Sequence, residues 1–216
     1  MRKKQQHFYT GIVMIILFGI WTYLIQAVDV QPAGETATNI GFATFNCGFH
    51  TLTGVHMGIY ALTDWLGLVP VFVCLLFGLL GLSQLVKRKQ LRNVDPDLLL
   101  LGVYYVLVIM SYLLFETYPI NYRPILIEGR MEASYPSSTT LLVLSVMPTL
   151  VFQTRRRIHS QTVRRGIVWG AMLFSLFMVV GRLVAGVHWF TDIVGSILLS
   201  TGLFQLYKAV VLCCKK

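Results

Sequence analysis

Long runs of apolar residues, separated by short polar segments, dominate the pattern along the chain. A helix that spans a bilayer needs about 20 mostly apolar residues, and several runs come close to that length. They lie at 11–28, 66–86, 98–115, 137–153, 167–187 and 193–212. The fourth run is short and contains Pro148, which a membrane helix tolerates when neighbouring groups satisfy the freed carbonyl. The pattern predicts an all-α fold, a polytopic membrane protein of about six transmembrane helices that forms a single domain over residues 1–216.

The segment 31–65, between the first two runs, has a different pattern. Its large apolar residues recur every three or four positions, at Phe42, Phe45, Phe49, Leu52, Val55, Ile59 and Leu62. This period predicts an amphipathic helix that lies on the outer surface of the membrane. The first apolar run follows basic residues, as in a signal peptide, but no small-residue cleavage site ends it, so we expect a retained helix.

Composition supports a membrane protein and not a soluble one. The chain is 56% hydrophobic and 12% charged, with a mean hydropathy of +0.68, whereas a soluble domain is about 25% charged. Its four cysteines show no paired spacing typical of a metal site. The formal net charge of +9 could indicate binding to nucleic acid, but the sidedness of membrane loops offers a second explanation.

The positions of the basic residues decide between these explanations. They cluster at 2–4, 87–92 and 155–165 and at the C-terminal Lys215 and Lys216, and six spans place all four clusters on one side. Of the 18 Lys and Arg residues, those predicted on the other side are Arg123, Arg130 and Arg182. The positive-inside rule makes the basic side cytoplasmic. The charge therefore indicates a lipid bilayer as partner, and no nucleic acid.

Three short stretches at the predicted outer ends carry the chemistry of interest. They are Asn121-Tyr-Arg-Pro124, Tyr135-Pro-Ser-Ser-Thr-Thr140 and Arg182-x5-His188-x3-Asp192. The topology brings all three to one face of the membrane. Ionisable groups at membrane depth are costly, and they mark a functional site or a paired structural network.

The third stretch contains a candidate nucleophile. His188 and Asp192 are four residues apart, so on a helical turn they share a face, where Asp192 could accept a hydrogen bond from one ring nitrogen. The other nitrogen is then free to attack an electrophile. A carboxylate that sets the tautomer and stabilises imidazolium is what a nucleophilic or general-base histidine requires.

The remaining polar residues suit a phosphate group. Arg123 and Arg182 carry permanent charge, and their forked guanidinium groups match phosphate oxygens. Pro136 and the hydroxyl residues at 137–139 are typical of a helix start, where free backbone N–H groups and the helix dipole favour an anion. These residues predict a phosphate-binding site with a histidine directed into it.

Together, R-P, P-S-x-x and R-x5-H-x3-D resemble the three-part signature of the type 2 phosphatidic acid phosphatase superfamily, or lipid phosphate phosphatases, in its membrane branch. The resemblance covers residues 116–192. It implies that His188 is a nucleophile that forms a phosphohistidine and that Asp192 orients it, with no metal or cofactor. The phosphate ligands it implies are Arg123, Ser137, Ser138 and Arg182.

Two positions depart from the family pattern. The lysine of the first motif is replaced by Glu116, and the histidine of the second motif, which protonates the leaving group, is replaced by Thr139. A threonine is a poor proton donor near neutral pH, and a general acid typically contributes about 100- to 10,000-fold in rate. The carboxylic acids Glu116, Glu128 and Glu132 could supply the proton instead, and Arg130 could replace the lysine.

The sequence therefore predicts an integral membrane phosphatase or phosphotransferase. Its substrate would be a lipid phosphate or diphosphate at the outer leaflet, for example a polyprenyl diphosphate or a phosphatidate-type lipid. The alternative is a non-catalytic protein that binds or transports a lipid phosphate. A structural alternative for Arg182, His188 and Asp192 is an ion-pair network that joins the last two helices. The oligomeric state stays open.

Overall fold

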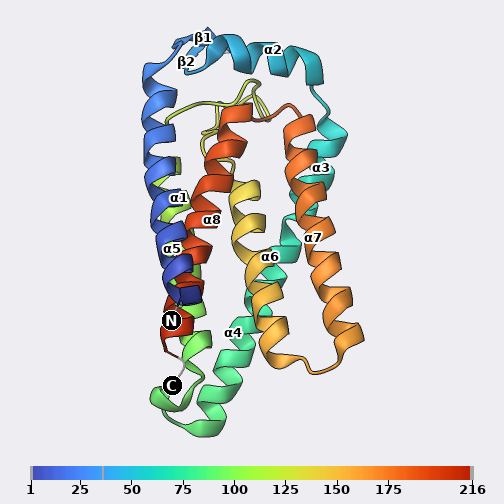
Figure 1. Cartoon of the computed structure of the whole chain (residues 1–216). Coiled ribbons are helices and arrows are strands. Elements are labelled where there is room, and N and C mark those ends of the chain that lie inside the picture. The colour runs from blue at the N-terminus through green and yellow to red at the C-terminus, as the bar shows by residue number, and fades with distance from the viewer. Residues whose placement is uncertain (1, 36, 215–216) are drawn as a thin grey trace.

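The computed structural model describes residues 2–35 and 37–214, and long helices make up most of it (Figure 1). Lys215 and Lys216 lie outside the described residues. The long helices are α1 (Arg2–Ala27), α4 (Leu68–Arg88), α5 (Pro96–Thr117), α6 (Ser138–Arg157), α7 (Gln161–Val184) and α8 (Phe190–Cys213). The shorter elements are β1 (Gln31–Ala33), β2 (Thr38–Ile40), α2 (Ala43–Thr53), α3 (Met57–Leu66) and the 3₁₀ turn η1 (Leu91–Asn93). This confirms the predicted all-α polytopic fold.

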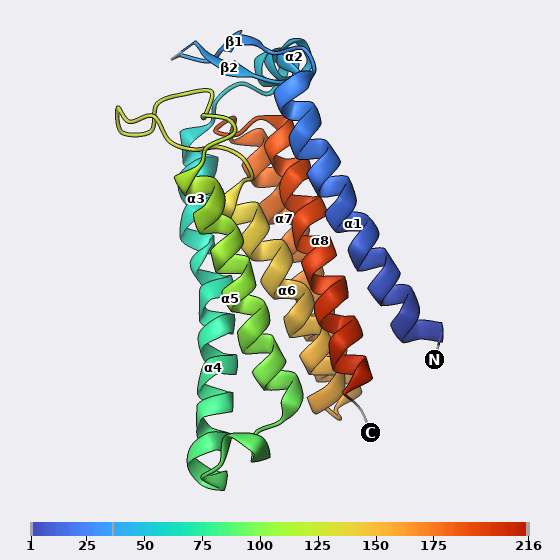
Figure 2. The same ribbon diagram turned by 90° about the vertical axis from the view of Figure 1, so that its left-hand side faces the viewer.

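Five segments within the described residues are long and apolar enough to cross a membrane. They are Lys4–Ala27, Met57–Arg88, Pro96–Thr117, Gln161–Val184 and Phe190–Cys213. Helix α6, the fourth predicted span, is less apolar because it packs against α4, α5, α7 and α8. Its polar residues Ser145, Thr149 and Gln153 are fully buried among these neighbours. A helix covered by other helices does not need an apolar surface, so α6 runs through the bundle as its interior helix (Figure 2).

The segment 31–65 corrects one prediction, because it is not one amphipathic helix. It contains the β1–β2 hairpin, then α2, which lies across the end of the bundle, and then α3, which turns into the bundle and continues into α4 (Figure 1). Gly54 ends α2 with a φ of 69°, a backbone conformation that favours glycine and that an α-helix cannot contain. The surface helix is therefore α2 alone, and the second span begins at Met57 and not at 66.

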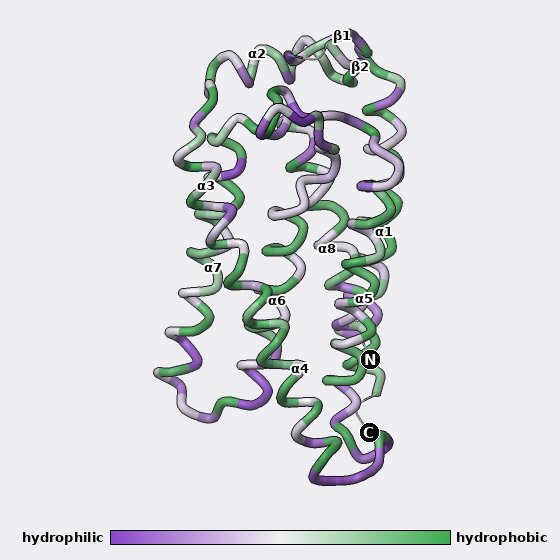
Figure 3. Tube along the Cα trace, turned by 180° about the vertical axis from the view of Figure 1, so that it is seen from behind, coloured by the Kyte–Doolittle hydropathy of each residue, from purple (hydrophilic) through white to green (hydrophobic). Residues whose placement is uncertain are grey.

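The two ends of the bundle differ in character. We call the end with the α4–α5 and α6–α7 turns the basic end, and the opposite end, which carries α2 and the α5–α6 loop, the site end (Figure 1). Polar segments gather at both ends, and apolar segments lie between them (Figure 3). This arrangement is typical of a bundle whose middle faces lipid.

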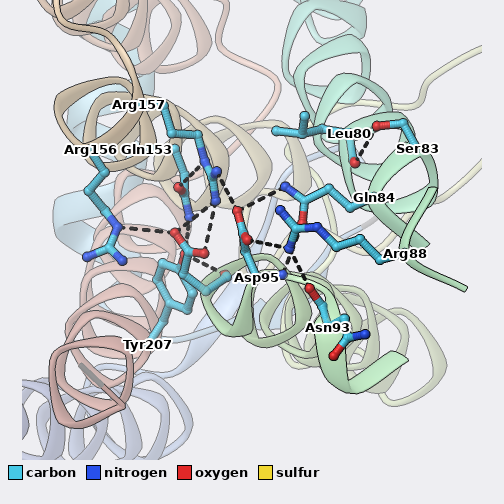
Figure 4. Close-up of polar contacts among 11 residues, drawn as sticks. Leu80, Ser83, Gln84, Arg88, Asn93, Asp95, Gln153, Arg156, Arg157 and Tyr207 are labelled. Atoms are coloured by element: carbon cyan, nitrogen blue, oxygen red, sulfur yellow. Dashed lines mark hydrogen bonds and ion pairs between the residues drawn. The ribbon is translucent and has the colours of Figure 1, made fainter. Parts of the chain in front are cut away.

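An ion-pair network closes the basic end (Figure 4). Asp95 pairs with Arg88 and Arg157 at 2.9 Å, and Asp97 pairs with Arg157 at 2.9 Å and with Arg156 at 3.1 Å. Burial of Asp95 opposes its ionisation, but hydrogen bonds from arginine outweigh that effect and lower its pKa to about 2. The network joins the start of α5 to the ends of α4 and α6.

Candidate active site

The loop that carries His188 joins α7 to α8 and is held by α2 and by the link between α2 and α3. The backbone N–H of His56 donates to the carbonyl of Ala185 at 3.0 Å, and His50 Nε2 donates to the carbonyl of Gly186 at 3.0 Å. At Gly186, φ is +68°, and a Cβ atom would lie 2.0 Å from the carbonyl oxygen of Gly54. Only glycine permits this close approach, so Gly186 locks the loop against the site end.

His188 is buried, and each of its ring nitrogens has a different environment. Nδ1 lies 3.1 Å from both the carbonyl oxygen and the Oγ of Ser134, and Nε2 lies 3.3 Å from Nη2 of Arg182. A carbonyl can only accept, so Nδ1 carries the proton and Nε2 presents its lone pair toward the guanidinium group. Burial, followed by the charges of Arg123 and Arg182, lowers the pKa of His188 well below its usual value. The neutral imidazole required of a nucleophile is therefore favoured.

Asp192 is fully buried and accepts three hydrogen bonds. Its Oδ2 accepts from the backbone N–H of Trp189 at 2.8 Å and from the hydroxyl of Ser134, and its Oδ1 accepts from Asn121 Nδ2 at 3.2 Å. These donors offset the cost of burying a charge. The bond from Trp189 places Asp192 in a capping position at the start of α8.

The expected direct hydrogen bond between Asp192 and His188 is replaced by a contact through Ser134. Asp192 Oδ2 is 3.9 Å from His188 Nδ1, which is beyond hydrogen-bond distance. The Ser134 hydroxyl lies between them, at 3.1 Å from Nδ1, and donates to Asp192. The carboxylate of Asp192 is thus linked to the imidazole by hydrogen bonds through Ser134, and its negative charge lies close to the ring.

Two buried arginines face His188 from different elements. Arg123, in the α5–α6 loop, is 9% exposed and pairs with Glu132 at 3.2 Å. Arg182, near the end of α7, is 1% exposed and pairs with Asp64 of α3 at 3.7 Å. Both guanidinium groups lie over the ring of Tyr60, at 5.8 Å and 4.9 Å from its centroid. This shared contact brings the two positive charges together beside the histidine.

These arginines retain buried donors without protein partners. Among the residues that the structure describes, no acceptor lies within hydrogen-bond distance of three buried donors, Arg123 Nε, Arg123 Nη1 and Arg182 Nε. A buried donor left unsatisfied costs about 1–3 kcal/mol, and more when charged. Such donors are suited to the oxygens of an anionic ligand. Arg182 contacts both Asp64 and His188, and the described residues show no ion pair between Arg182 and Asp192.

Two adjacent cavities open at the site end and share Tyr112 and Ser138. The polar cavity, of about 220 Å³, is lined by Tyr112, Phe115, Glu116, Arg123, Glu132, Ala133, Tyr135, Pro136 and Ser138. The apolar cavity, of about 280 Å³, is lined by Asp64, Gly67, Val108, Ile109, Tyr112, Ser138, Thr139, Leu141 and Leu142. The arrangement places a charged chamber next to a chamber whose walls suit hydrocarbon.

The other predicted site residues fall into two groups. Glu116 and Ser138 line the polar cavity, and Thr139 lines the apolar one. Ser137 is fully buried and lines neither cavity, because its hydroxyl donates to Thr140 at 3.1 Å within the first turn of α6. The structure also keeps Glu128 and Arg130 away from both cavities, on an exposed turn of the α5–α6 loop.

Several residues that complete the site were not predicted from the sequence. Ser134 and Asn121 lie two positions from predicted residues, within or beside the motif stretches, and only their three-dimensional contacts reveal a role. Tyr60 and Asp64 belong to α3, a segment that had been assigned to the surface helix. The turn signal at Gly54, just before α3, is the feature that could have separated α3 from that helix.

Comparison with known proteins identifies a family. Residues 111–212 match the model of the PAP2 superfamily, and this range contains all three motif stretches. A search of curated proteins finds no match to the sequence. A similar solved structure is the crystal structure of a transmembrane PAP2-type phosphatidylglycerolphosphate phosphatase from Bacillus subtilis, with a TM-score of 0.69 and 16% identity. The likeness covers 96% of this chain and 98% of that chain, and it shows a shared fold. The predicted resemblance is confirmed, and the match to the PAP2 superfamily model supports a phosphatase-type function.

Proposed function

Residues 111–212 of this membrane chain belong to the PAP2 superfamily, and on that premise we propose that the protein is a phosphatase or phosphotransferase for a lipid phosphate or diphosphate. His188 attacks the phosphorus atom, and Arg123 and Arg182 bind the phosphoryl oxygens. The observation that carries this proposal is the set of buried, unpartnered guanidinium donors beside a neutral histidine. Phosphoryl transfer depends mainly on such positioning and charge stabilisation.

The proposed reaction proceeds in two steps. His188 Nε2 forms a bond to phosphorus as the bond from phosphorus to the lipid oxygen breaks, and the lipid oxygen leaves with the electron pair. Water then attacks the phosphorus atom of the phosphohistidine, and the bond from phosphorus to Nε2 breaks with its electron pair returning to the ring. The protons of the water stay with the released inorganic phosphate, and the neutral imidazole is restored. Nδ1 keeps its proton throughout and donates it in a hydrogen bond to the carbonyl of Ser134. The nearby Asp192 carboxylate stabilises the positive charge that develops on the ring.

The two cavities support a lipid as substrate. The polar cavity contains Arg123 and two carboxylic acids, Glu116 and Glu132, and the apolar cavity next to it is lined by side chains from α5 and α6 that suit an acyl or prenyl chain. A headgroup and a hydrocarbon chain would then occupy adjacent chambers.

The threonine at position 139 favours a diphosphate. Expulsion of an alkoxide from a monophosphate ester needs a proton in the transition state, whereas a phosphate monoester leaving from a diphosphate is a much weaker base. The lack of a histidine at this position therefore slows hydrolysis of a diphosphate less than hydrolysis of a monophosphate. Glu116 and Glu132 line the polar cavity and are the carboxylic acids placed to donate a proton there.

The competing proposal is a protein that binds lipid phosphate without turning it over. Thr139 favours it, as do the carboxylates that already pair with the arginines, Glu132 with Arg123 and Asp64 with Arg182. Both proposals predict binding, so turnover must decide between them.

The deciding experiment measures release of inorganic phosphate by the purified full-length protein from a panel of lipid monophosphates and diphosphates. We expect release that His188→Ala abolishes while the variant still binds the lipid and keeps its thermal unfolding midpoint. Binding without release by the parent protein would support the non-catalytic alternative. Release that survives His188→Ala would exclude this histidine as nucleophile.

We also propose that the site end faces outward and the basic end faces the cytoplasm, in accord with the positive-inside rule. Ser160, in the turn between α6 and α7, lies at the basic end. In a cysteine-free version of the protein, Ser160→Cys should react with a membrane-impermeant thiol reagent only after the cells are opened. Reaction in intact cells would reverse the orientation and move the site to the inner leaflet.

A further inference from the structure

A second cavity with a defined chemical character lies at the basic end, away from the candidate active site. It forms a groove of about 370 Å³ between α6, α7 and α8. Its walls are mainly apolar, with Leu144, Met147 and Phe152 of α6 opposite Met172 of α7 and Phe204 of α8. Helices α7 and α8 lie on different sides of α6 and touch each other little along this stretch, which leaves the groove open between them (Figure 1).

Two positive charges line the end of this groove nearest the basic end. Arg155, near the end of α6, is exposed, and Lys208, in α8, is half-buried, and both contribute to the lining. Neither forms an ion pair with any residue that the structure describes. Two charges of the same sign thus line one groove. An arrangement of this kind is stabilised by an anion.

The carboxylates at the basic end are already engaged by other arginines. Asp95 pairs with Arg88 and Arg157 (Figure 4). Asp97 pairs with Arg156 and Arg157. The network therefore neutralises the two arginines that follow Arg155 in the sequence but leaves Arg155 itself and Lys208 to the groove. An anion that pairs with these two side chains would come from outside this network.

The length of the groove matches one leaflet. From Leu144 to Arg155, eleven residues of α-helix rise about 16 Å, and half of a hydrocarbon core is about 15 Å. The groove therefore runs from near the middle of the bilayer to the headgroup region. Its apolar walls suit an acyl chain, and its two cations lie where the phosphate of that lipid would be.

We propose that this groove binds an anionic phospholipid of the leaflet at the basic end, with an acyl chain between α6, α7 and α8 and the phosphate on Arg155 and Lys208. The bound lipid fills the space between α7 and α8 and so supports the helix that carries Arg182 and the helix that carries Asp192. This site is separate from the candidate active site and does not depend on the reaction proposed there.

The test uses the full-length protein with Phe204→Trp as a reporter in the groove, in nanodiscs of phosphatidylcholine. Added phosphatidylglycerol with brominated acyl chains should quench the reporter more strongly than brominated phosphatidylcholine does. The parent protein, without the reporter, gives the baseline from the native tryptophans. Each basic residue near a membrane surface contributes about 1 kcal/mol to binding anionic lipid, so Arg155→Gln with Lys208→Gln should weaken the preference roughly thirtyfold.

A matched control removes the same charge at the same end of the bundle. Arg164 and Arg165, in the first turns of α7, do not line the groove, so Arg164→Gln with Arg165→Gln should leave the preference nearly unchanged. An equal loss in this control would show general surface attraction and overturn the proposal. Equal quenching by both lipids would overturn it, as would displacement of the lipid by inorganic phosphate alone. A change in particle mass in the Arg155 and Lys208 variant would indicate instead that the groove is an interface between copies of the chain.

Discussion

Replacement of Ser134 by alanine tests the role that the structure gives to a residue outside the predicted catalytic set. The Ser134 hydroxyl lies between His188 Nδ1 and Asp192 Oδ2, and it is one of three donors to that carboxylate. The Ser134 carbonyl also accepts from Nδ1 and remains in the variant. The substitution therefore removes the link between imidazole and carboxylate but keeps the tautomer.

The size of the effect follows from this geometry. A hydrogen bond to a charged group contributes about 1.5–3 kcal/mol, which corresponds to roughly 10- to 150-fold in rate if it is expressed fully in the transition state. Ser134 contacts Nδ1, the ring nitrogen that does not attack, and Asp192, so it has no direct contact with the bound phosphate in the proposed scheme. We expect kcat to fall within this range, while KM changes by less than about threefold.

The assay is steady-state phosphate release with the best substrate of the lipid panel, measured together with thermal unfolding. The control is Ser200→Ala, which removes another fully buried hydroxyl that donates to the carbonyl of Ile197 in α8, remote from the site. The control should lose some stability and keep its kcat. If Ser134→Ala and Ser200→Ala have the same kcat as the parent, Ser134 does not couple Asp192 to the imidazole.

Three further predictions follow from the site. Asp192→Asn should lower kcat by about 100- to 10,000-fold with little change in the amount of folded protein, since the charge that stabilises the imidazolium is lost; turnover close to that of the parent would refute its role. The parent should prefer the diphosphate over the monophosphate of one lipid in kcat/KM, and Thr139→His should raise monophosphate hydrolysis by about 100-fold or more; a parent that prefers the monophosphate and an unchanged variant would refute the leaving-group argument. Because the pKa of His188 is lowered in the folded protein, its contribution to stability is complete above the unfolded value of about 6.5 and is lost as pH falls below it. The unfolding midpoint should therefore drop between pH 7 and pH 5, and His188→Asn should reduce that drop; an identical pH dependence in this variant would show that His188 is not buried in the neutral form.

The sequence alone determined the membrane class, most of the long helices and the motif residues at the site end. Runs of apolar residues are a local property, and the solvation of the backbone in a bilayer leaves few alternatives to a helix. The motif stretches lie between or at the ends of these helices, so the topology was sufficient to predict that Arg123, Arg182 and His188 meet at one end. The topology could not predict which of these residues contact each other.

The tertiary structure decided what surrounds those residues. Residues 31–65 have one apolar period, but the left-handed backbone at Gly54 and the packing of α3 on α7 divide the segment and bring Tyr60 and Asp64 to the arginines. Ser134 meets Asp192 across 58 positions of sequence, a contact set by how the α5–α6 loop folds over α8. Helix α6 can be less apolar than its neighbours because the other helices cover it, and that cover exists only in the folded bundle. Periodicity reports which face of an element is apolar, whereas the partner of that face, and each hydrogen bond across it, depends on the packing of the whole chain.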